Sequence, residues 1–320
     1  MSQIYLSAKL PELGTKLLKN AALDYTVYTG NQLITKEELI KNVANCEVLI
    51  CPLSTLVDRE VIDAAPKLKL IANFGAGFNN IDTVYAKEKH IYVTNTPKVS
   101  TNATAELTAG LIIALSRRIV EGDRLMHGQG FDGWAPLFFL GHELKDKTLG
   151  IIGMGQIGQA LAQMMTAFGM KIIYNQRQQL PPELEKKLQA TFCSQTELIQ
   201  QADILSLHAP LTTETHHLLT SETFEQMKDN AFLINAARGP LIDEAALLQA
   251  LKNRQIVGAA LDVYEFEPEV VAGLKTLDNV ILTPHIGNAS VEARNDMAAI
   301  VAKNAIAFFE KQPIHYIVNQ

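Results

Sequence analysis

Hydrophobic and polar residues alternate over the first hundred positions in a pattern that predicts a repeat of strands and helices. Short runs rich in β-branched and aromatic residues indicate strands, at 4–8, 25–28, 47–53, 68–75 and 91–97. The segments between them space their apolar residues as helices do, at 9–20, 35–46, 58–66 and 82–90. Strands that alternate with helices imply right-handed crossovers, so we expect a parallel sheet covered on both faces.

The pattern changes after Thr101. Residues 101–126 predict one long helix that is apolar along most of its length and is therefore buried at an interface. The segment FDGWAPLFFLGHEL at 131–144 holds too many Gly, Pro and aromatic residues for a regular element. This segment and the apolar helix 104–116 would expose a large apolar surface, which predicts a symmetric dimer that buries both.

A second series of apolar runs predicts another α/β unit. Its strands are expected at 148–155, 171–176, 202–210, 231–237, 256–264 and 279–285. A last helix at 290–312 begins after Asn288 and is expected to pack on the first unit. The later unit is thus inserted into the earlier one, and the chain crosses between them near Pro97 and Ile286.

Composition narrows the class of protein. The chain has 320 residues, 48% of them hydrophobic, which suits about two folded domains and excludes a disordered or repetitive chain. A net charge of −6 with scattered Lys and Arg argues against a nucleic-acid partner. Three cysteines without a CxxC pair indicate a reduced, cytoplasmic protein.

One uncharged stretch, 148–170, is long enough to span a bilayer. It contains three Gln and five Gly, so a buried strand followed by a closely packed helix explains it better. The first residues also lack the basic-then-apolar order of a signal peptide. We therefore expect no membrane association.

A glycine loop lies inside that stretch. Gly153, Gly155 and Gly158 fit the pattern GxGxxG, with a strand-like run before them and a helical run after them. In this setting the first glycine permits a tight turn, the second admits a pyrophosphate, and the third lets the helix pack on the strand. The helix N-terminus then meets the negative charge, which predicts dinucleotide binding rather than a merely structural turn.

The next predicted strand ends in Asn175, Gln176 and Arg177, without a carboxylate. An NAD-specific site normally places Asp or Glu there to bind the ribose hydroxyls. Arg177 could instead pair with a 2′-phosphate, although it could also be a solvated loop charge. The sequence favours NADP(H), and NAD(H) remains possible.

Polar residues follow three later strands and are expected to meet at one edge of the sheet, where ligands bind. Arg238 could bind a substrate carboxylate, His285 could donate a proton, and Glu267 could hold the histidine. Reduction of a 2-oxo acid requires such a set. Glu265 competes with Glu267 for this role, and Arg238 could instead form a structural salt bridge.

Three histidines, His208, His216 and His217, resemble a metal cluster only superficially, because they lie at a strand end and in the loop after it. No metal site is predicted.

These motifs resemble the D-isomer-specific 2-hydroxyacid dehydrogenase family over essentially the whole chain. Three blocks carry the resemblance: GIIGMGQIG at 150–158, MKDNAFLINAARGPLIDEAAL at 227–247, and GAALDVYEFEP with TPHIG near the end. The resemblance implies that 99–287 is a Rossmann dinucleotide-binding domain, a doubly wound parallel sheet. This domain is inserted into a flavodoxin-like substrate-binding domain formed by 1–98 and 288–320.

The resemblance also implies site residues. Arg238, Glu267 and His285 take the catalytic roles, and the backbone of Ala76 and Gly77 helps Arg238 bind the substrate. Asp262 would face the nicotinamide carboxamide. The full set of expected cofactor contacts is Thr104, Gly153, Gly155, Gln156, Ile157, Gly158, Asn175, Arg177, His208, Pro210, Thr215, Ala236, Asp262, His285 and Gly287.

Within the family, the CPLS loop at 51–54, the segment with Trp134 and the YNQRQ strand end look like the glyoxylate/hydroxypyruvate reductase branch. That branch implies a cytoplasmic homodimer acting on a small 2-oxo or 2-hydroxy acid, with the Trp segment reaching the neighbouring subunit's site. Phosphoglycerate dehydrogenases usually carry an Arg in the loop that here reads CPLST. A phosphoglycerate dehydrogenase-like enzyme and a dinucleotide-sensing corepressor remain the alternatives.

Overall fold

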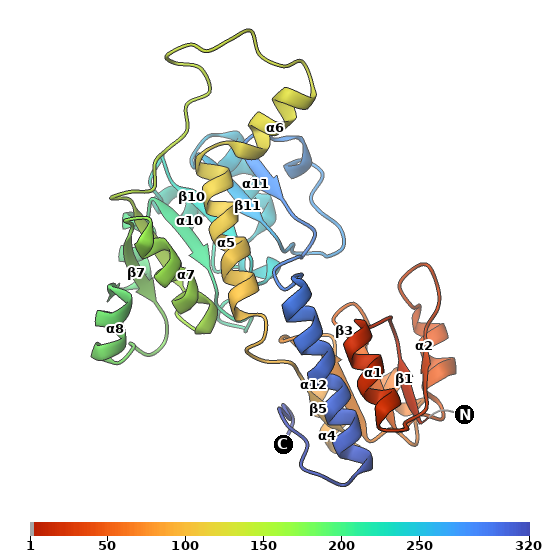
Figure 1. Cartoon of the computed structure of the whole chain (residues 1–320). Coiled ribbons are helices and arrows are strands. Elements are labelled where there is room, and N and C mark those ends of the chain that lie inside the picture. Colours follow the sequence, from red (N-terminus) through yellow and green to blue (C-terminus); the bar gives the residue numbers. More distant parts are fainter. Residues whose placement is uncertain (1–2) are drawn as a thin grey trace. The chain divides into compact units, whose positions relative to one another are not determined.

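The computed structural model describes residues 3–320, and the chain forms two compact units (Figure 1). The first unit comprises the residues up to Ser100 together with Asn288–Gln320, and the second is Thr101–Gly287. Each unit contains one parallel sheet between helices.

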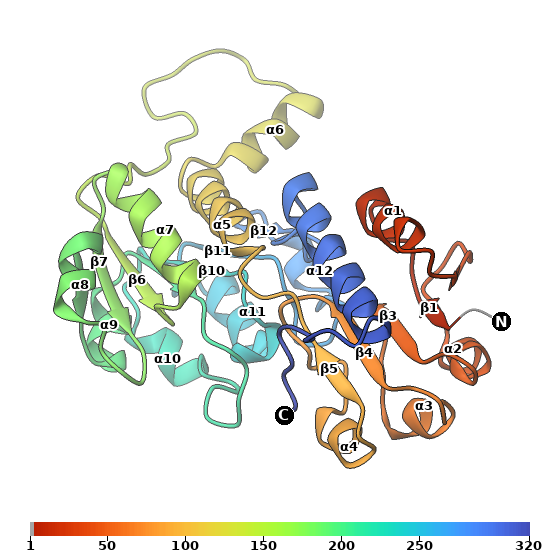
Figure 2. The same ribbon diagram turned by 60° about the horizontal axis from the view of Figure 1, so that its bottom comes forward.

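The five strands of the first unit are ordered β2-β1-β3-β4-β5. They are β1 (Ile4–Leu6), β2 (Tyr25–Val27), β3 (Val48–Pro52), β4 (Leu70–Phe74) and β5 (Tyr92–Thr94). One face packs on α1 (Glu12–Asn20) and α12 (Val291–Phe309). The other face packs on α2 (Lys36–Val43), α3 (Arg59–Asp63) and α4 (Thr83–Glu88), so both faces are covered (Figure 2).

The seven strands of the second unit are ordered β12-β11-β10-β9-β6-β7-β8. Their bounds are β6 (Thr148–Ile152), β7 (Lys171–Asn175), β8 (Ala190–Phe192), β9 (Ile204–Leu207), β10 (Phe232–Asn235), β11 (Gly258–Leu261) and β12 (Val280–Leu282). On one face lie α5 (Thr101–Ser116), α7 (Gln156–Ala167) and α8 (Pro182–Leu188). On the other lie α9 (Gln195–Gln201), α10 (Ser221–Gln226) and α11 (Glu244–Lys252) (Figure 2).

The predicted fold class is confirmed. The first strand order is that of a flavodoxin-like sheet, and the second is that of a Rossmann sheet with one further strand, β12. Every predicted strand is present. The strand β8 was not predicted, because its three residues are too few to carry an alternation pattern.

The single long helix predicted over 101–126 is wrong. The chain forms α5, then leaves helical geometry at Arg118, whose φ is +56°, and resumes as α6 (Ile119–His127). The Arg118 guanidinium lies 4.0 Å from the centre of the Phe139 ring and pairs with Glu121. Contacts from the 131–144 segment therefore fix a break that the apolar pattern alone does not reveal.

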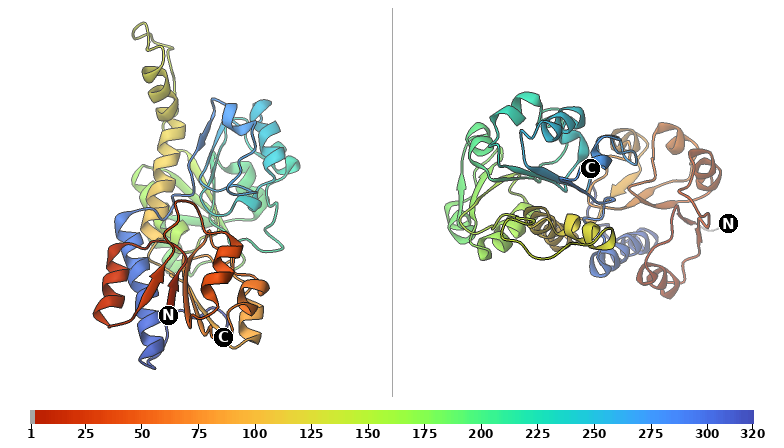
Figure 3. Two further views of the ribbon diagram at one scale, coloured as in Figure 1. Left: turned by 90° about the vertical axis from the view of Figure 1, so that its right-hand side faces the viewer. Right: turned by 90° about the horizontal axis from the view of Figure 1, so that it is seen from above.

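The burial of α5 also differs from the expectation. Its apolar residues, among them Ala105, Ile112 and Leu115, pack into the core between α7 and its own sheet. The exposed apolar surface comes instead from α6 and the segment after it, which extend away from the sheet of this unit (Figure 3). In residues 3–320, no helix is long and apolar enough to cross a membrane.

Candidate active site

The glycine loop joins β6 to α7 as the motif requires. Gly153 has φ +95°, and a Cβ there would lie 2.6 Å from the backbone N of Ala209. A Cβ on Gly158 would lie 2.5 Å from the carbonyl oxygen of Gly153. Both positions therefore require glycine, one for its conformation and the other for the close approach of helix and loop.

The middle glycine has a different surrounding. Gly155 is the N-cap of α7. Among the described residues 3–320, no side chain caps this helix, and a Cβ on Gly155 would meet no atom within 4 Å. Gln156 beside it is exposed, and Ile157 is half-buried. The uncapped N–H groups and the open space fit a pyrophosphate, so the residues present suit a dinucleotide.

The end of β7 is organised by amides. Asn175 donates from Nδ2 to the carbonyl oxygen of Cys193 at 2.8 Å, and Gln176 accepts from the N–H of Met154 at 3.1 Å. Gln176 was not among the expected site residues, yet it ties this turn to the glycine loop. Arg177 is exposed and lies close enough to Glu214 to lower the pKa of that carboxyl, after the larger effect of the Thr212 hydroxyl.

The segment after β9 carries three further predicted cofactor contacts. The His208 ring lies 2.8 Å from the Ser206 hydroxyl, and desolvation lowers the pKa of His208 to about 4, so this ring is neutral near pH 7. Pro210 is exposed, and its carbonyl oxygen accepts from the Thr215 hydroxyl at 2.7 Å. Thr215 thus closes the loop on itself.

Arg238 follows β10 in a turn built by Asn235. The buried Asn235 amide donates to the Arg238 carbonyl oxygen at 2.9 Å and accepts from the N–H of Ala237 at 3.0 Å, around the half-buried Ala236. Burial lowers the pKa of Arg238, and the charge of Glu267 opposes that effect. A desolvated guanidinium of this kind binds a carboxylate strongly.

Asp262, at the end of β11, is fully buried. Its carboxylate accepts from the Thr283 hydroxyl at 2.6 Å and from the N–H groups of Ile286 and Gly287 at 2.8 and 2.7 Å. It therefore fixes the loop that presents His285. The expected contact of Asp262 with a nicotinamide carboxamide stays a prediction.

Two other expected cofactor contacts adjoin this loop. A Cβ on Gly287 would lie 3.4 Å from the methyl group of Thr104, which is buried in the first turns of α5. Gly287 and Thr104 therefore lie side by side in the second unit.

The geometry favours Glu267 over Glu265 as the partner of His285. Glu267 Oε2 lies 2.8 Å from His285 Nδ1, and its Oε1 accepts from the N–H of Tyr264 at 3.0 Å. Burial alone would raise the pKa of Glu267, but His285, the Tyr264 N–H and Arg238 bring it below its usual value. His285 itself has φ +52°, an uncommon conformation for a non-glycine residue.

Glu265 is engaged elsewhere: its Oε1 lies 2.6 Å from His217 Nε2. His217 thus has an acidic partner that is distant in the sequence. Within residues 3–320 there is no group of three or more His, Cys, Asp or Glu side chains arranged to hold a metal ion.

In the first unit, the predicted substrate loop follows β4. The Ala76 carbonyl oxygen accepts from the Asn95 amide at 2.7 Å, and that of Gly77 accepts from the Asn73 amide at 2.6 Å. The N–H groups of Ala76 and Gly77 make no hydrogen bond within the described residues. The two amide side chains fix the backbone of Ala76 and Gly77 through its carbonyl groups. The two N–H groups are therefore held in place and can bind an anionic oxygen.

Comparison with known proteins agrees with this architecture. The family model "D-isomer specific 2-hydroxyacid dehydrogenase, NAD binding domain" matches residues 109–287. A Staphylococcus aureus protein carrying the name "Putative 2-hydroxyacid dehydrogenase" is 51% identical to this chain, and the match covers 100% of both chains.

Solved structures extend the comparison. A glyoxylate reductase from Paecilomyes thermophila has 32% identity, a TM-score of 0.87 and coverage of 99% of this chain and 98% of its own. An NADPH-dependent glyoxylate/hydroxypyruvate reductase from Sinorhizobium meliloti, in complex with NADP and malonate, has 29% identity, a TM-score of 0.82 and coverage of 98% and 96%. A D-lactate dehydrogenase from Aquifex aeolicus, complexed with NAD and lactic acid, has 29% identity, a TM-score of 0.85 and coverage of 99% of both chains.

The chain belongs to the D-isomer-specific 2-hydroxyacid dehydrogenase family. It is therefore an oxidoreductase with an NAD-binding domain in its second unit, and the resemblance inferred from its motifs is confirmed.

Proposed function

We propose that the protein reduces a small 2-oxo acid of the glyoxylate or hydroxypyruvate type to the D-2-hydroxy acid. The bound dinucleotide would supply the hydride. Arg238 would bind the substrate carboxylate through its planar guanidinium. In the first unit, the N–H groups of Ala76 and Gly77 would be donors to an anionic substrate. His285, held at Nδ1 by Glu267, would donate a proton from Nε2 to the carbonyl oxygen.

The observation that carries this proposal is the hydrogen bond of 2.8 Å between His285 and Glu267, with Arg238 close enough to affect the pKa of Glu267. A histidine paired with a carboxylate favours the imidazolium form, which can act as a proton donor. Arg238 keeps the surroundings positive, as a carboxylate substrate requires.

Steady-state kinetics would test the substrate class. Glyoxylate, hydroxypyruvate, pyruvate and 3-phosphohydroxypyruvate would each be compared, with NADPH and with NADH. We expect the highest kcat/KM for glyoxylate or hydroxypyruvate. A clear preference for pyruvate would indicate a D-lactate dehydrogenase, and no turnover of any acid would contradict the proposal.

We propose further that NADPH is the preferred cofactor. The strand end carries Asn175 and an exposed Arg177 and no carboxylate, although Glu214 lies near enough to Arg177 to compete for its charge. Asn175→Asp should lower the NADPH to NADH ratio of kcat/KM at least tenfold, about 1.4 kcal/mol. Glu214→Gln should shift the ratio towards NADPH, because it frees Arg177 for the 2′-phosphate. A wild-type preference for NADH would contradict the proposal.

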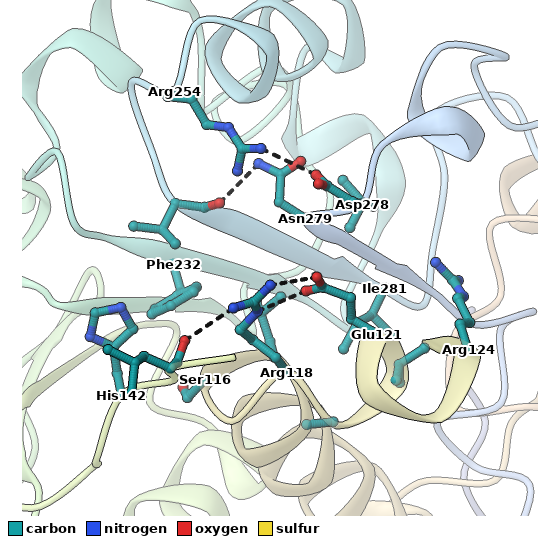
Figure 4. A pocket seen from close by; sticks show the side chains of 16 residues that line it. Ser116, Arg118, Glu121, Arg124, His142, Phe232, Arg254, Asp278, Asn279 and Ile281 are labelled. Carbon is teal, nitrogen blue, oxygen red and sulfur yellow. Dashed lines mark hydrogen bonds and ion pairs between the residues drawn. The ribbon is translucent and has the colours of Figure 1, made fainter. Parts of the chain in front are cut away.

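We also propose a homodimer formed through the second unit. Trp134 and Leu137 are each 84% exposed, and Phe138 and Leu140 beside them are exposed as well. The same segment borders a cavity of about 310 Å³ at the amino ends of β10–β12, with Phe232 in its wall and Arg118 and Arg124 on the α6 side (Figure 4). An exposed apolar segment next to a cavity suits a second copy of the chain, whose Trp134 segment would reach its partner's site.

Light scattering would test the dimer. We expect about twice the chain mass of 35.2 kDa at micromolar concentration. Leu137→Asp should shift the mass towards that of the monomer, whereas a charge change on α8, Lys187→Glu, should not. An active wild-type monomer would contradict this part of the proposal.

A further inference from the structure

The loop that carries Glu267 is held by a group of side chains that the proposed reaction does not use. A Cβ on Gly239 would lie 1.8 Å from the carbonyl oxygen of Tyr264, so the loop packs directly against the turn after Arg238. The N–H of Glu265, the next residue, donates to Glu244 Oε1 at 2.8 Å. The position of Glu267 therefore depends on what holds residues 264 and 265.

Glu244, the first residue of α11, interacts with Glu265 in both directions. Its carboxylate accepts from the Glu265 N–H, and its own N–H donates to Glu265 Oε2 at 3.2 Å. The Glu265 carboxylate thus satisfies an N–H in the first turn of α11, where negative charge is favoured. Two reciprocal bonds fix the loop more firmly than a single bond would.

Glu244 is unusual because only 2% of its surface is exposed and, within residues 3–320, its Oε2 has no hydrogen-bond partner. Burial raises the pKa of Glu244, and the charges of Glu265 and Glu267 act in the same direction against backbone hydrogen bonds. An acid on the solvent-exposed face of a helix would need neither this burial nor a hydrogen bond from the loop. A buried acid of this kind costs stability.

His217 completes the group from the segment after β9. Its Nε2 lies 2.6 Å from Glu265 Oε1, and its N–H donates to the Pro240 carbonyl oxygen at 2.8 Å. His217 therefore joins the loop of Glu265 to the turn that follows Arg238. Tyr264 and Glu267 of the loop are further ionisable groups near Glu244, and the centre of the His216 ring lies 4.1 Å from that of His217.

We propose that Glu244, Glu265 and His217 form a clamp of positioning residues, which fixes the loop so that Glu267 stays hydrogen-bonded to His285. This inference rests on the proposed function of Glu267 and His285. The three side chains of the clamp are not among the residues proposed to bind the substrate or the cofactor. The clamp acts through the backbone of Tyr264 and Glu265, and it keeps the Glu267 carboxylate in the orientation in which one oxygen meets the Tyr264 N–H and the other meets His285.

The test compares four variants with the wild-type protein. Glu244→Ala removes the acceptor of the Glu265 N–H, whereas Glu244→Gln keeps an acceptor of the same shape. His217→Leu opens the clamp at its more exposed end. Glu269→Gln changes an exposed acid of the same loop and is the matched control. The two readouts are the pH profile of 2-oxo acid reduction and the NMR titration of the His285 ring.

We expect Glu244→Ala and His217→Leu to lower kcat about tenfold, since small displacements of catalytic groups are costly. Both should move the descending limb of the pH profile, and the His285 titration, to lower pH, while dinucleotide affinity stays unchanged. Glu244→Gln and Glu269→Gln should leave the descending limb of the pH profile at its wild-type position.

Wild-type titration of His285 in both Glu244→Ala and His217→Leu would overturn the proposal. A lower melting temperature with an unmoved His285 titration would do the same, because it would indicate a merely structural role. If Glu244→Ala does not fold, His217→Leu decides the question. If the wild-type protein reduces no 2-oxo acid, the proposed function fails, and the NMR titration still tests the clamp.

Discussion

The carboxyl-terminal edges of the two sheets use different chemistry to hold their loops. In the first unit, neutral amides bind backbone carbonyl groups, as Asn73 and Asn95 do around Ala76 and Gly77. In the second unit, amides such as that of Asn235 are joined by ionisable side chains that hydrogen-bond to one another, as His285 does with Glu267 and His217 with Glu265. The side chains that hold Ala76 and Gly77 are thus neutral amides, whereas those around His285 and Glu265 include groups that titrate.

The difference indicates that the two edges have different functions. An amide network keeps the same geometry at any ordinary pH and presents backbone N–H groups, which suits binding of a carboxylate. A network of acids and histidines changes with pH and can move a proton. We therefore expect substitutions at the second edge to change kcat and the pH profile, and substitutions at the first edge to change KM alone.

The largest effect should come from removing the proton donor. His285→Ala is expected to lower kcat about 10²–10⁴-fold at every pH, as is usual for loss of a general acid. Dinucleotide affinity, measured by fluorescence titration, should stay near the wild-type value. A variant that keeps most of its activity would exclude His285 as the donor.

The next effect concerns Arg238. Arg238→Lys should lower kcat/KM for the 2-oxo acid about 10–100-fold, because a lysine cannot form two parallel hydrogen bonds to a carboxylate. Kinetics with varied 2-oxo acid should show a raised KM and a lowered kcat. Equal losses of cofactor and substrate affinity would instead assign Arg238 to structural support.

Glu267→Gln should change the pH profile more than the activity in acid. The carboxylate is ionised at neutral pH, because its folded pKa lies below the usual value, and its negative charge lies beside the His285 ring. Loss of this charge should move the descending limb of reduction by about 1–3 pH units to lower pH. An unmoved limb would show that Glu267 is not the partner.

The lowered pKa of Glu267 also predicts the direction in which stability changes with pH. A carboxyl group with a depressed folded pKa stabilises the fold above its unfolded pKa, and this contribution is lost as pH falls through the folded value. Thermal unfolding of the wild-type protein and of Glu267→Gln should therefore differ at neutral pH and converge in acid below the usual pKa of 4.5.

The smallest effect is expected at the sheet edge of the first unit, where amide side chains hold the loop. Asn95→Ala removes the bond to the Ala76 carbonyl oxygen and should raise KM for the 2-oxo acid roughly fivefold, the effect of about 1 kcal/mol. Its pH profile should match that of the wild type. A moved limb would contradict the contrast between the two edges.

Sequence and tertiary structure contributed differently to these conclusions. The glycine loop was predictable, because Gly153 and Gly158 satisfy local backbone demands that the motif records. The strands were predictable, because strands buried on both faces are continuous apolar runs. The break at Arg118 was not, because contacts with Phe139 and Glu121 accompany it and the apolar pattern continues through it.

The sequence by itself determined the fold class, the family and the types of residue available for chemistry. Only the tertiary structure decided which carboxylate meets which histidine. Glu265 and Glu267 are two residues apart and equivalent in any pattern, yet one pairs with His217 and the other with His285. Likewise, the sequence shows Glu244 only as an acid in the first turn of a helix. The tertiary structure shows that it is buried against the loop of Tyr264. Hydrogen bonds between residues far apart in sequence depend on how the chain packs, and packing is a property of the whole fold.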